Sequence, residues 1–257
     1  MDRQVLQTNK TSKIGFSGST LKIIAIVTML IDHIGAAIIE TMNIYDSSGH
    51  IINQNLYIAD RITRAIGRLA FPIFCFLLVE GFFYTHSRVK YAIRLAIFAL
   101  ISEIPFDLAF TKQPLYLEYQ NVFFTLLIGM LMMMAIQYVR DNILPKITKG
   151  KNMVALLLQT VIFLAAAYLA TLLRTDYNFW GITAIFLMYI LRFSRLYMCL
   201  CESLFFMSFE FPTAIISFLP IYYYNGKRGL KIKYFFYIFY PAHLLILYGI
   251  YLLYFAS

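Results

Sequence analysis

Charged residues are scarce in this chain of 257 residues. Lys, Arg, Asp and Glu together make up 14% of the sequence, whereas 61% is hydrophobic and the mean hydropathy is +0.71. A soluble catalytic domain would need a long polar stretch, and the sequence contains none. The composition therefore predicts an all-α fold, that of a polytopic integral membrane protein.

Cysteines are few, and the common motifs of soluble enzymes are missing. The three cysteines, Cys75, Cys199 and Cys201, lie in apolar runs without the spacing of metal ligands, so we expect reduced thiols, no disulfide and no metal site. The sequence has no glycine-rich nucleotide loop, no HExxH motif and no internal repeat. Its net charge of +9 follows a membrane-topology pattern, so we expect no nucleic-acid binding.

The apolar runs predict about nine transmembrane helices, within a range of eight to ten. The first run is too long for a cleaved signal peptide, so we expect it to remain as a helix after a polar, cytoplasmic segment 1–19. Residues 20–257 are expected to form one transmembrane domain. The helices are expected near 20–40, 64–85, 91–110, 121–139, 153–173, 178–192, 196–209, 211–224 and 234–254.

Two details of this topology remain open or depend on charge. Glu210 and Pro212 interrupt the two short helices expected near 196–209 and 211–224. The alternative for this pair is a broken or re-entrant element. Lys and Arg collect in alternate connections, and short cytoplasmic loops carry such an excess. The pattern predicts a cytoplasmic N-terminus.

An ionisable pair, Asp32 and His33, lies within the first apolar run. Such residues are costly in a bilayer and predict a functional site. Because adjacent residues on a helix point about 100° apart, we expect Asp32 to pair with another helix and not with His33. Lys22 is eleven residues before His33, so both share one face of the helix about 16 Å apart. The alternative for Lys22 is a lysine that snorkels to the membrane surface.

Arginines and carboxylates form two further stripes. Arg64 and Arg68 share one helix face, and Glu103 and Asp107, four residues apart, share another. We expect arginine–carboxylate pairing between these two helices, with Pro105 bending the second. Structural ion pairing alone is the alternative to a catalytic role, because buried charges are paired in either case.

Other polar residues within or near the spans complete the candidate site. His243 lies in the last apolar run, just after Pro241, and is a candidate for catalysis or ligand binding, with a structural role as the alternative. Asp176 and Tyr177 lie in a short connection expected on the outer side. Asn121 is expected to begin a helix, where capping is the alternative to a supporting role in the site. Glu80 is expected to take part in helix packing.

Six strings of the sequence carry a resemblance when they are taken together and in order. They are LKIIAIVTMLIDHIG, IGRLAFPIFCFLLVEGFFYT, SEIPFDL, QNVFFTLLIGM, TDYNFWGI and NGKRGLKIKYFFYIFYPAHLLILY. This combination resembles the TraX family of bacterial membrane proteins over about residues 20–254. The family takes its name from a conjugative-transfer protein that N-acetylates pilin. The resemblance implies a multi-pass protein of the bacterial inner membrane, whose acceptor is pilin, another peptide or a small molecule.

The TraX family in turn resembles the acyltransferase-three superfamily, which takes acyl groups from a cytoplasmic coenzyme A thioester. Its first helix carries a basic residue and a histidine eleven positions apart, and Lys22 and His33 match this pair with Lys in place of Arg. Arg64 and Arg68 resemble its arginine-rich motif with altered spacing. The resemblance implies acetyl-coenzyme A as co-substrate, with Lys22, Arg64 and Arg68 as candidates to bind it.

The chemistry of acetyl transfer assigns roles to these residues. An amine or hydroxyl acceptor loses a proton as it attacks the thioester, and an imidazole is well suited to take that proton. We therefore expect His33 to be the general base, with Glu103 or Asp107 as the carboxylate that orients its ring. Arg64 and Arg68 are expected to stabilise the oxyanion or to hold donor phosphates.

Two other classes of function fit the same residues. Buried histidines and carboxylates near proline also occur in proton-coupled transporters. A conjugation or secretion assembly factor without catalytic activity is the third possibility. Binding of acetyl-coenzyme A separates the enzyme from both.

Overall fold

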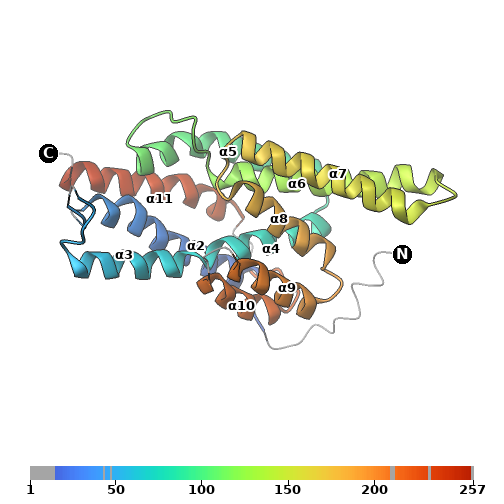
Figure 1. The fold of residues 1–257 in the computed structure, drawn as a ribbon, viewed down its shortest axis with the longest axis horizontal. Helices are drawn as coiled ribbons and strands as arrows, with labels where there is room; N and C mark the ends of the chain where they lie inside the picture. The colour runs from blue at the N-terminus through green and yellow to red at the C-terminus, as the bar shows by residue number, and fades with distance from the viewer. Residues whose placement is uncertain (1–14, 43, 47, 209–211, 231–232, 256–257) are drawn as a thin grey trace. The chain divides into compact units, whose positions relative to one another are not determined.

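The computed structural model describes residues 15–42, 44–46, 48–208, 212–230 and 233–255, and most of these residues lie in helices. The α-helices in chain order are α2 (Gly18–Ala37), α3 (Gln54–Gly67), α4 (Ala70–Tyr84), α5 (Arg88–Thr111), α6 (Val122–Tyr138), α7 (Lys151–Leu172), α8 (Asn178–Ile190), α9 (Arg195–Met207), α10 (Phe218–Tyr222) and α11 (Lys233–Tyr254). Within these residues, β pairing is confined to isolated bridges such as that between Phe16 and Tyr224. The predicted all-α class is therefore confirmed (Figure 1).

Several helices are suited to a bilayer. Within the described residues, five are long and apolar enough to cross one. They are Gly18–Thr41, Gln54–Tyr84, Val122–Lys146, Lys151–Leu172 and Phe235–Tyr254. Two shorter apolar helices, Asn178–Ile190 and Pro212–Tyr222, accompany them. The chain is thus a membrane protein with several apolar helices, whereas nine spans and a cytoplasmic N-terminus stay predictions. Glu210 lies outside the described residues, so its role in a re-entrant element is also untested.

The helix expected over 64–85 is wrong in its start and its continuity. α3 begins at Gln54, where the Asn53 side chain accepts a hydrogen bond from the backbone N–H of Leu56 and caps the helix. α3 ends at Gly67, and α4 begins at Ala70. Pro72 explains the break, because it cannot donate to the carbonyl four residues earlier and its ring crowds that carbonyl.

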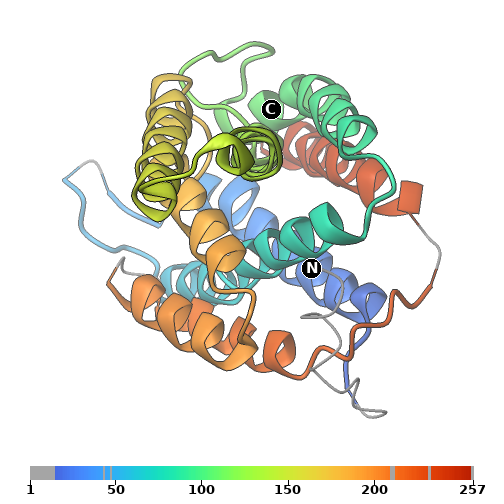
Figure 2. The ribbon, with the colours of Figure 1, turned by 90° about the vertical axis from the view of Figure 1, so that its right-hand side faces the viewer.

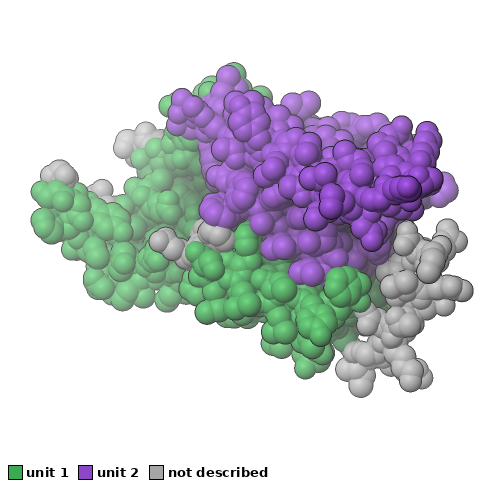
Figure 3. All heavy atoms as spheres, turned by 45° about the vertical axis from the view of Figure 1, so that its right-hand side comes forward, with its two compact units in different colours: residues 1–74, 104–115, 193–257 green, residues 75–103, 116–192 purple. Residues whose placement is uncertain are grey.

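The described chain forms two compact units, which Figure 3 distinguishes by colour. Unit 1 combines Met1–Phe74, Ile104–Leu115 and Phe193–Ser257, and unit 2 combines Cys75–Glu103 and Tyr116–Arg192. Each unit is therefore assembled from segments that are separate in the sequence. A single domain over residues 20–257 stays a prediction.

Unit 1 is organised around α2, which packs against α3 and α11. Glycines allow the close approach of α2 to α3, because a Cβ at Gly35 would overlap the Thr63 hydroxyl and one at Gly67 would overlap the Asp32 carboxylate. At the far end of α2, the Lys112 ammonium donates to the carbonyl of Ala109 at 2.6 Å and to that of Ala37 at 3.3 Å. Partial burial lowers the pKa of Lys112.

Unit 2 is built mainly from α6, α7 and α8, which pack on one another. α7 lies beside α6 in both ribbon views (Figure 1 and Figure 2). The interior is filled by large apolar side chains, including Met130, Met133, Ile182 and Met188, all fully buried. Gly129 of α6 lets the side chain of Ile185 on α8 approach the backbone. The unit places the short connection before α8 against the start of α6.

Candidate functional site

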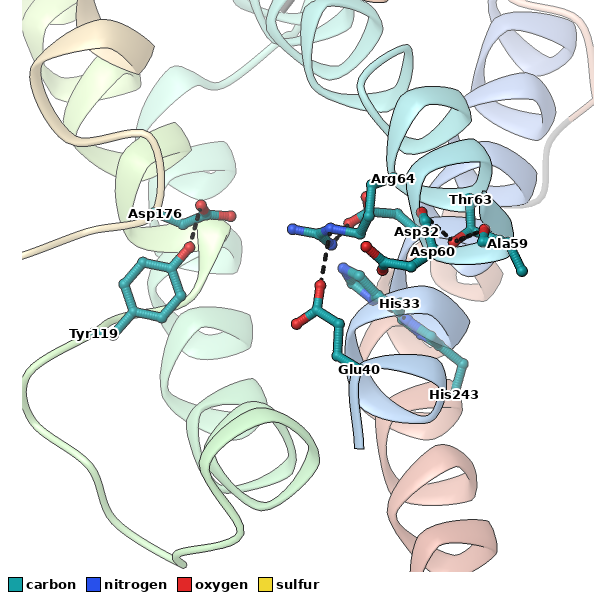
Figure 4. Close-up of polar contacts among 10 residues, drawn as sticks. All are labelled: Asp32, His33, Glu40, Ala59, Asp60, Thr63, Arg64, Tyr119, Asp176 and His243. Carbon is teal, nitrogen blue, oxygen red and sulfur yellow. Dashed lines mark hydrogen bonds and ion pairs between the residues drawn. The ribbon is translucent and has the colours of Figure 1, made fainter. Parts of the chain in front are cut away.

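Two histidines that are 210 residues apart in the sequence meet in unit 1. Nδ1 of His33 on α2 lies 2.7 Å from Nε2 of His243 on α11. The ring centroids are 5.0 Å apart and the ring planes differ by 10°, which is the geometry of an in-plane hydrogen bond between two imidazoles. Figure 4 shows the two rings pointing toward each other between the helices. Both residues are sequence-predicted site residues.

The other nitrogen of His243 fixes how this pair is protonated. His243 Nδ1 lies 2.7 Å from the backbone carbonyl oxygen of Phe239, which can only accept. In the neutral pair, His243 therefore carries its proton on Nδ1, and its Nε2 accepts from Nδ1–H of His33. Nε2 of His33 is then left with a lone pair. The arrangement gives His33 the tautomer that a general base requires.

Aromatic rings enclose the histidine pair. Phe110 contacts the His33 ring edge to face, with centroids 5.1 Å apart, and Tyr240 lies at 6.0 Å. Phe239 stacks on His243 at 4.9 Å, and His243 is only 4% exposed. The apolar surroundings favour uncharged imidazoles, and they hold the rings in place.

An ion-pair cluster lies beside the histidines on α2. Nη1 of Arg64 donates to the Asp32 carboxylate at 2.8 Å, and its Nε lies 3.4 Å from a carboxylate oxygen of Glu40 (Figure 4). The expected pairing of Asp32 with another helix is confirmed, since Arg64 belongs to α3. The expectation that Arg64 pairs with Glu103 or Asp107 is wrong, because Asp32 and the turn that follows α2 supply its carboxylates.

The cluster of Asp32, Glu40 and Arg64 joins parts of the fold and is poorly suited to bind phosphates. Two carboxylates occupy the guanidinium of Arg64, so the group as a whole carries an excess of negative charge when all members are ionised. Such an arginine is poorly placed to attract donor phosphates. It joins α2, the turn at Ile39–Thr41 and α3 beside the histidine pair.

Lys22, Arg68 and Asp107 also belong to unit 1. The Lys22 ammonium lies 5.3 Å from the ring centroid of Phe236 on α11, one of several cation–aromatic contacts. Arg68 is the C-cap of α3, and its backbone N–H donates to the carbonyl of Arg64 at 3.2 Å. Asp107 is fully buried on α5. The side chain that orients His33 is the imidazole of His243, which accepts from His33 Nδ1–H in place of the expected carboxylate of Glu103 or Asp107.

The remaining candidates form a polar group in unit 2. The Asn121 side chain donates to a Glu103 carboxylate oxygen and, at 2.9 Å, to the carbonyl of Ala99, while its own oxygen accepts from the N–H of Phe123. Asn121 is thus the N-cap of α6, as the capping alternative predicted. Glu103 is 8% exposed and joins α5 to the start of α6.

Asp176 and Tyr177 lie in the connection before α8. The Tyr119 hydroxyl donates to Asp176 at 2.7 Å (Figure 4). The Thr125 hydroxyl donates to the Asp176 backbone carbonyl. Tyr177 has a φ of 63°, in the left-handed region, and is the N-cap of α8. These contacts describe a tightly held connection in unit 2, while the histidines and Arg64 belong to unit 1.

Glu40 is the main participant that sequence reasoning missed. It directly follows the first apolar run, Leu21–Ile39, and seven residues place it on nearly the same helix face as His33. The seven-residue spacing from His33 could therefore have identified Glu40 as a candidate site residue. The role of the Phe239 carbonyl had no signal in the sequence, because it depends on the rotamer of His243.

Comparison with known proteins gives a consistent family assignment. The profile of the family described as TraX protein matches residues 17–251. A curated protein of Dichelobacter nodosus, described as "Probable fimbrial assembly protein FimC, serogroup H1", is 29% identical over an alignment of 254 residues. The match covers 91% of this chain and 95% of that protein. No solved structure matches the chain.

Proposed function

Because the chain belongs to the TraX family, we propose that it is a membrane-embedded acetyltransferase. It moves an acetyl group from acetyl-coenzyme A to the amine of a peptide or pilin N-terminus, or to a hydroxyl acceptor. The observation that carries this proposal is the hydrogen-bonded series from the Phe239 carbonyl through His243 to His33. It leaves a basic nitrogen on His33 beside a buried partner.

The reaction follows from this tautomer. The acceptor nitrogen or oxygen attacks the thioester carbonyl carbon, and Nε2 of His33 takes the proton that the acceptor loses. The C–S bond then breaks, the acetyl group remains on the acceptor, and His33 returns the proton to the leaving thiolate, which departs as coenzyme A. His243 accepts a hydrogen bond from Nδ1 of His33 throughout and stabilises the imidazolium that forms.

The ion-pair cluster of Arg64, Asp32 and Glu40 contributes to this reaction by holding His33 in position. Arg64 holds Asp32, the immediate neighbour of His33, at 2.8 Å. The cluster therefore holds in place the turn of α2 that presents His33, and Arg64 acts as a positioning residue in this proposal.

An assembly role is the second candidate function. It is favoured by the printed description of the relative from Dichelobacter nodosus as a fimbrial assembly protein. An acetyltransferase that modifies a pilin and an assembly factor without chemistry are both compatible with that description. They differ in one property, since only the enzyme binds and consumes a thioester.

The test uses the full chain in nanodiscs with acetyl-coenzyme A and short peptides that have free N-termini. We expect thiol release, acetylated peptide by mass spectrometry and stabilisation of the protein by coenzyme A. His33→Ala should lower kcat at least a hundredfold, because it removes the general base. His86→Ala is the matched control, since His86 is exposed and lies in unit 2.

The outcomes separate the two candidate functions. Absence of coenzyme A binding at millimolar concentration would contradict the enzyme and leave the assembly role. Binding with full turnover by the His33→Ala variant would remove His33 from the mechanism. In sealed vesicles, a transporter would instead move protons across the membrane without releasing thiol.

A further inference from the structure

A basic loop in unit 1, Asn225–Gly229, lies against the first turn of α2. The backbone N–H of Gly18 donates to the Lys227 carbonyl at 2.8 Å, and that of Ser19 donates to the Arg228 carbonyl at 3.0 Å. The loop thereby satisfies N–H groups that the start of a helix leaves without an internal partner. These N–H groups are occupied, so any ligand at this end must be recognised by side chains.

The backbone of the loop is held in one conformation. The Asn225 side chain donates to the Gly15 carbonyl at 2.9 Å, and its oxygen accepts from the N–H of Lys227 at 2.9 Å. Gly229 has a φ of 72°, and a Cβ there would overlap the Ser19 hydroxyl. The two residues between the glycines at 226 and 229 are therefore presented from a fixed support.

Those two residues are Lys227 and Arg228, and both are exposed. Within the described residues, neither side chain forms an ion pair with a carboxylate. Two further cations lie nearby. Lys22 is one turn along α2 from Ser19, and Arg195 donates to the Tyr224 carbonyl directly before the loop. The end of unit 1 at this loop is thus strongly positive.

The same loop joins the two helices that carry the histidine pair. α2 starts at the loop and presents His33, and α11 follows the loop and presents His243. From Lys22 to His33 the rise along α2 is about 16 Å. An anion held at the loop can react at His33 only if it is long, with its reactive group at the opposite end from its phosphates. A small donor such as acetyl phosphate cannot bridge that distance.

We propose that the loop Asn225–Gly229, together with Lys22, binds the phosphate groups of a coenzyme A thioester whose acyl end reaches His33. This inference rests on the proposed function for its donor. The chemistry recognised is a phosphate ester, which acyl donors and anionic lipid headgroups both carry. The connection from the loop to both histidines favours the donor.

The experiment compares two donors in nanodiscs. Acetyl-coenzyme A has the phosphates, whereas S-acetyl-pantetheine has the thioester and the arm without any phosphate. Lys227→Ala/Arg228→Ala should raise KM for acetyl-coenzyme A about tenfold with kcat unchanged, since charge-assisted contacts are lost. KM for S-acetyl-pantetheine should stay the same. The substitutions leave the backbone carbonyls that cap α2 in place.

Two controls accompany this comparison. Lys146→Ala/Lys149→Ala removes the same charge from an exposed connection of unit 2 and should change neither KM. Lys227→Arg/Arg228→Lys keeps the charge and should restore the KM of the native protein for acetyl-coenzyme A.

The possible results support or overturn the inference. Unchanged KM for acetyl-coenzyme A in the double alanine variant overturns it. An equal effect on both donors that vanishes in zwitterionic nanodiscs shows that the loop binds anionic lipid headgroups instead. Coenzyme A binding by thermal shift keeps the two proposals distinct. If the native chain shows no turnover, acetyl transfer is contradicted. If the Lys227→Ala/Arg228→Ala variant then still binds coenzyme A more weakly than the native chain, the loop is supported as its phosphate-binding site.

Discussion

His243 is the residue on which the protonation of His33 depends. Its Nδ1 donates to a backbone carbonyl that cannot move without disrupting α11, so its Nε2 is held as an acceptor. A carboxylate in the same position would attract a proton more strongly and would carry a charge into an apolar environment. The imidazole orients His33 without adding that charge.

We predict that His243→Phe lowers kcat about tenfold to a hundredfold with little change in KM. His33 remains in this variant, but its Nδ1–H loses its acceptor and its ring loses the preferred tautomer. His243→Gln should recover part of the lost kcat, because an amide oxygen can accept the same hydrogen bond. Steady-state kinetics of both variants test this, and equal losses in the two would indicate a packing role for His243.

The two carboxylates on Arg64 should differ in their contribution to stability. The Asp32 side chain is 17% exposed and that of Glu40 is 48% exposed. Asp32→Asn should lower the free energy of unfolding by about 2 kcal/mol, because it leaves a mostly buried guanidinium poorly compensated. Glu40→Gln should cost less than about 1 kcal/mol because solvent screens that pair. Thermal unfolding in one detergent compares them, and a larger effect at Glu40 would contradict the assignment.

The candidate site residues were predictable one by one, but their partners were not. Helix geometry turned Asp32 away from His33, and an interhelical partner followed from that. The identity of that partner depended on how α3 lies against α2, for which the sequence gives no direct signal. The contact between His33 and His243 joins residues 210 positions apart, so it depends on the tertiary fold alone.

At the scale of the elements, α2 and α3 are held close by two glycines. We predict that Gly35→Ala and Gly67→Ala each destabilise the protein by about 1 to 3 kcal/mol, because the added methyl group overlaps Thr63 or Asp32. Gly249→Ala on α11 is the control, since no heavy atom lies within 4 Å of its Cβ position. That change should be neutral or stabilising by up to about 1 kcal/mol. The melting temperature should fall in the Gly35→Ala and Gly67→Ala variants and should stay the same or rise in Gly249→Ala.

Hydropathy located most of the helices and missed the start of α3. The segment from Gln54 to Arg64 is amphipathic and carries charges, so an apolar-run criterion excludes it. The capping residue Asn53 and the disruptive Pro72 were both readable in the sequence. Local signals at helix ends would therefore have corrected this element.

At the scale of the whole molecule, the sequence predicted an all-helical membrane protein and not its division into two units. Two of the four boundaries between the units, after Leu115 and after Arg192, lie in connections between helices, whereas those after Phe74 and after Glu103 fall inside α4 and α5. Linkers and changes of composition usually mark such boundaries, and neither occurs within an apolar helix. Tertiary contacts alone define the two boundaries inside helices.

The discontinuous make-up of unit 1 bears on the order in which the protein is made. Asp32 and Arg64 are 32 residues apart, so their pair can form early during translation. The contact of His33 with His243 can form only after the ribosome has added 210 more residues, which takes about 10 to 40 s at common elongation rates. During biogenesis the nascent chain thus holds α2 with an incomplete histidine pair, and the pair forms only when α11 has emerged and docked.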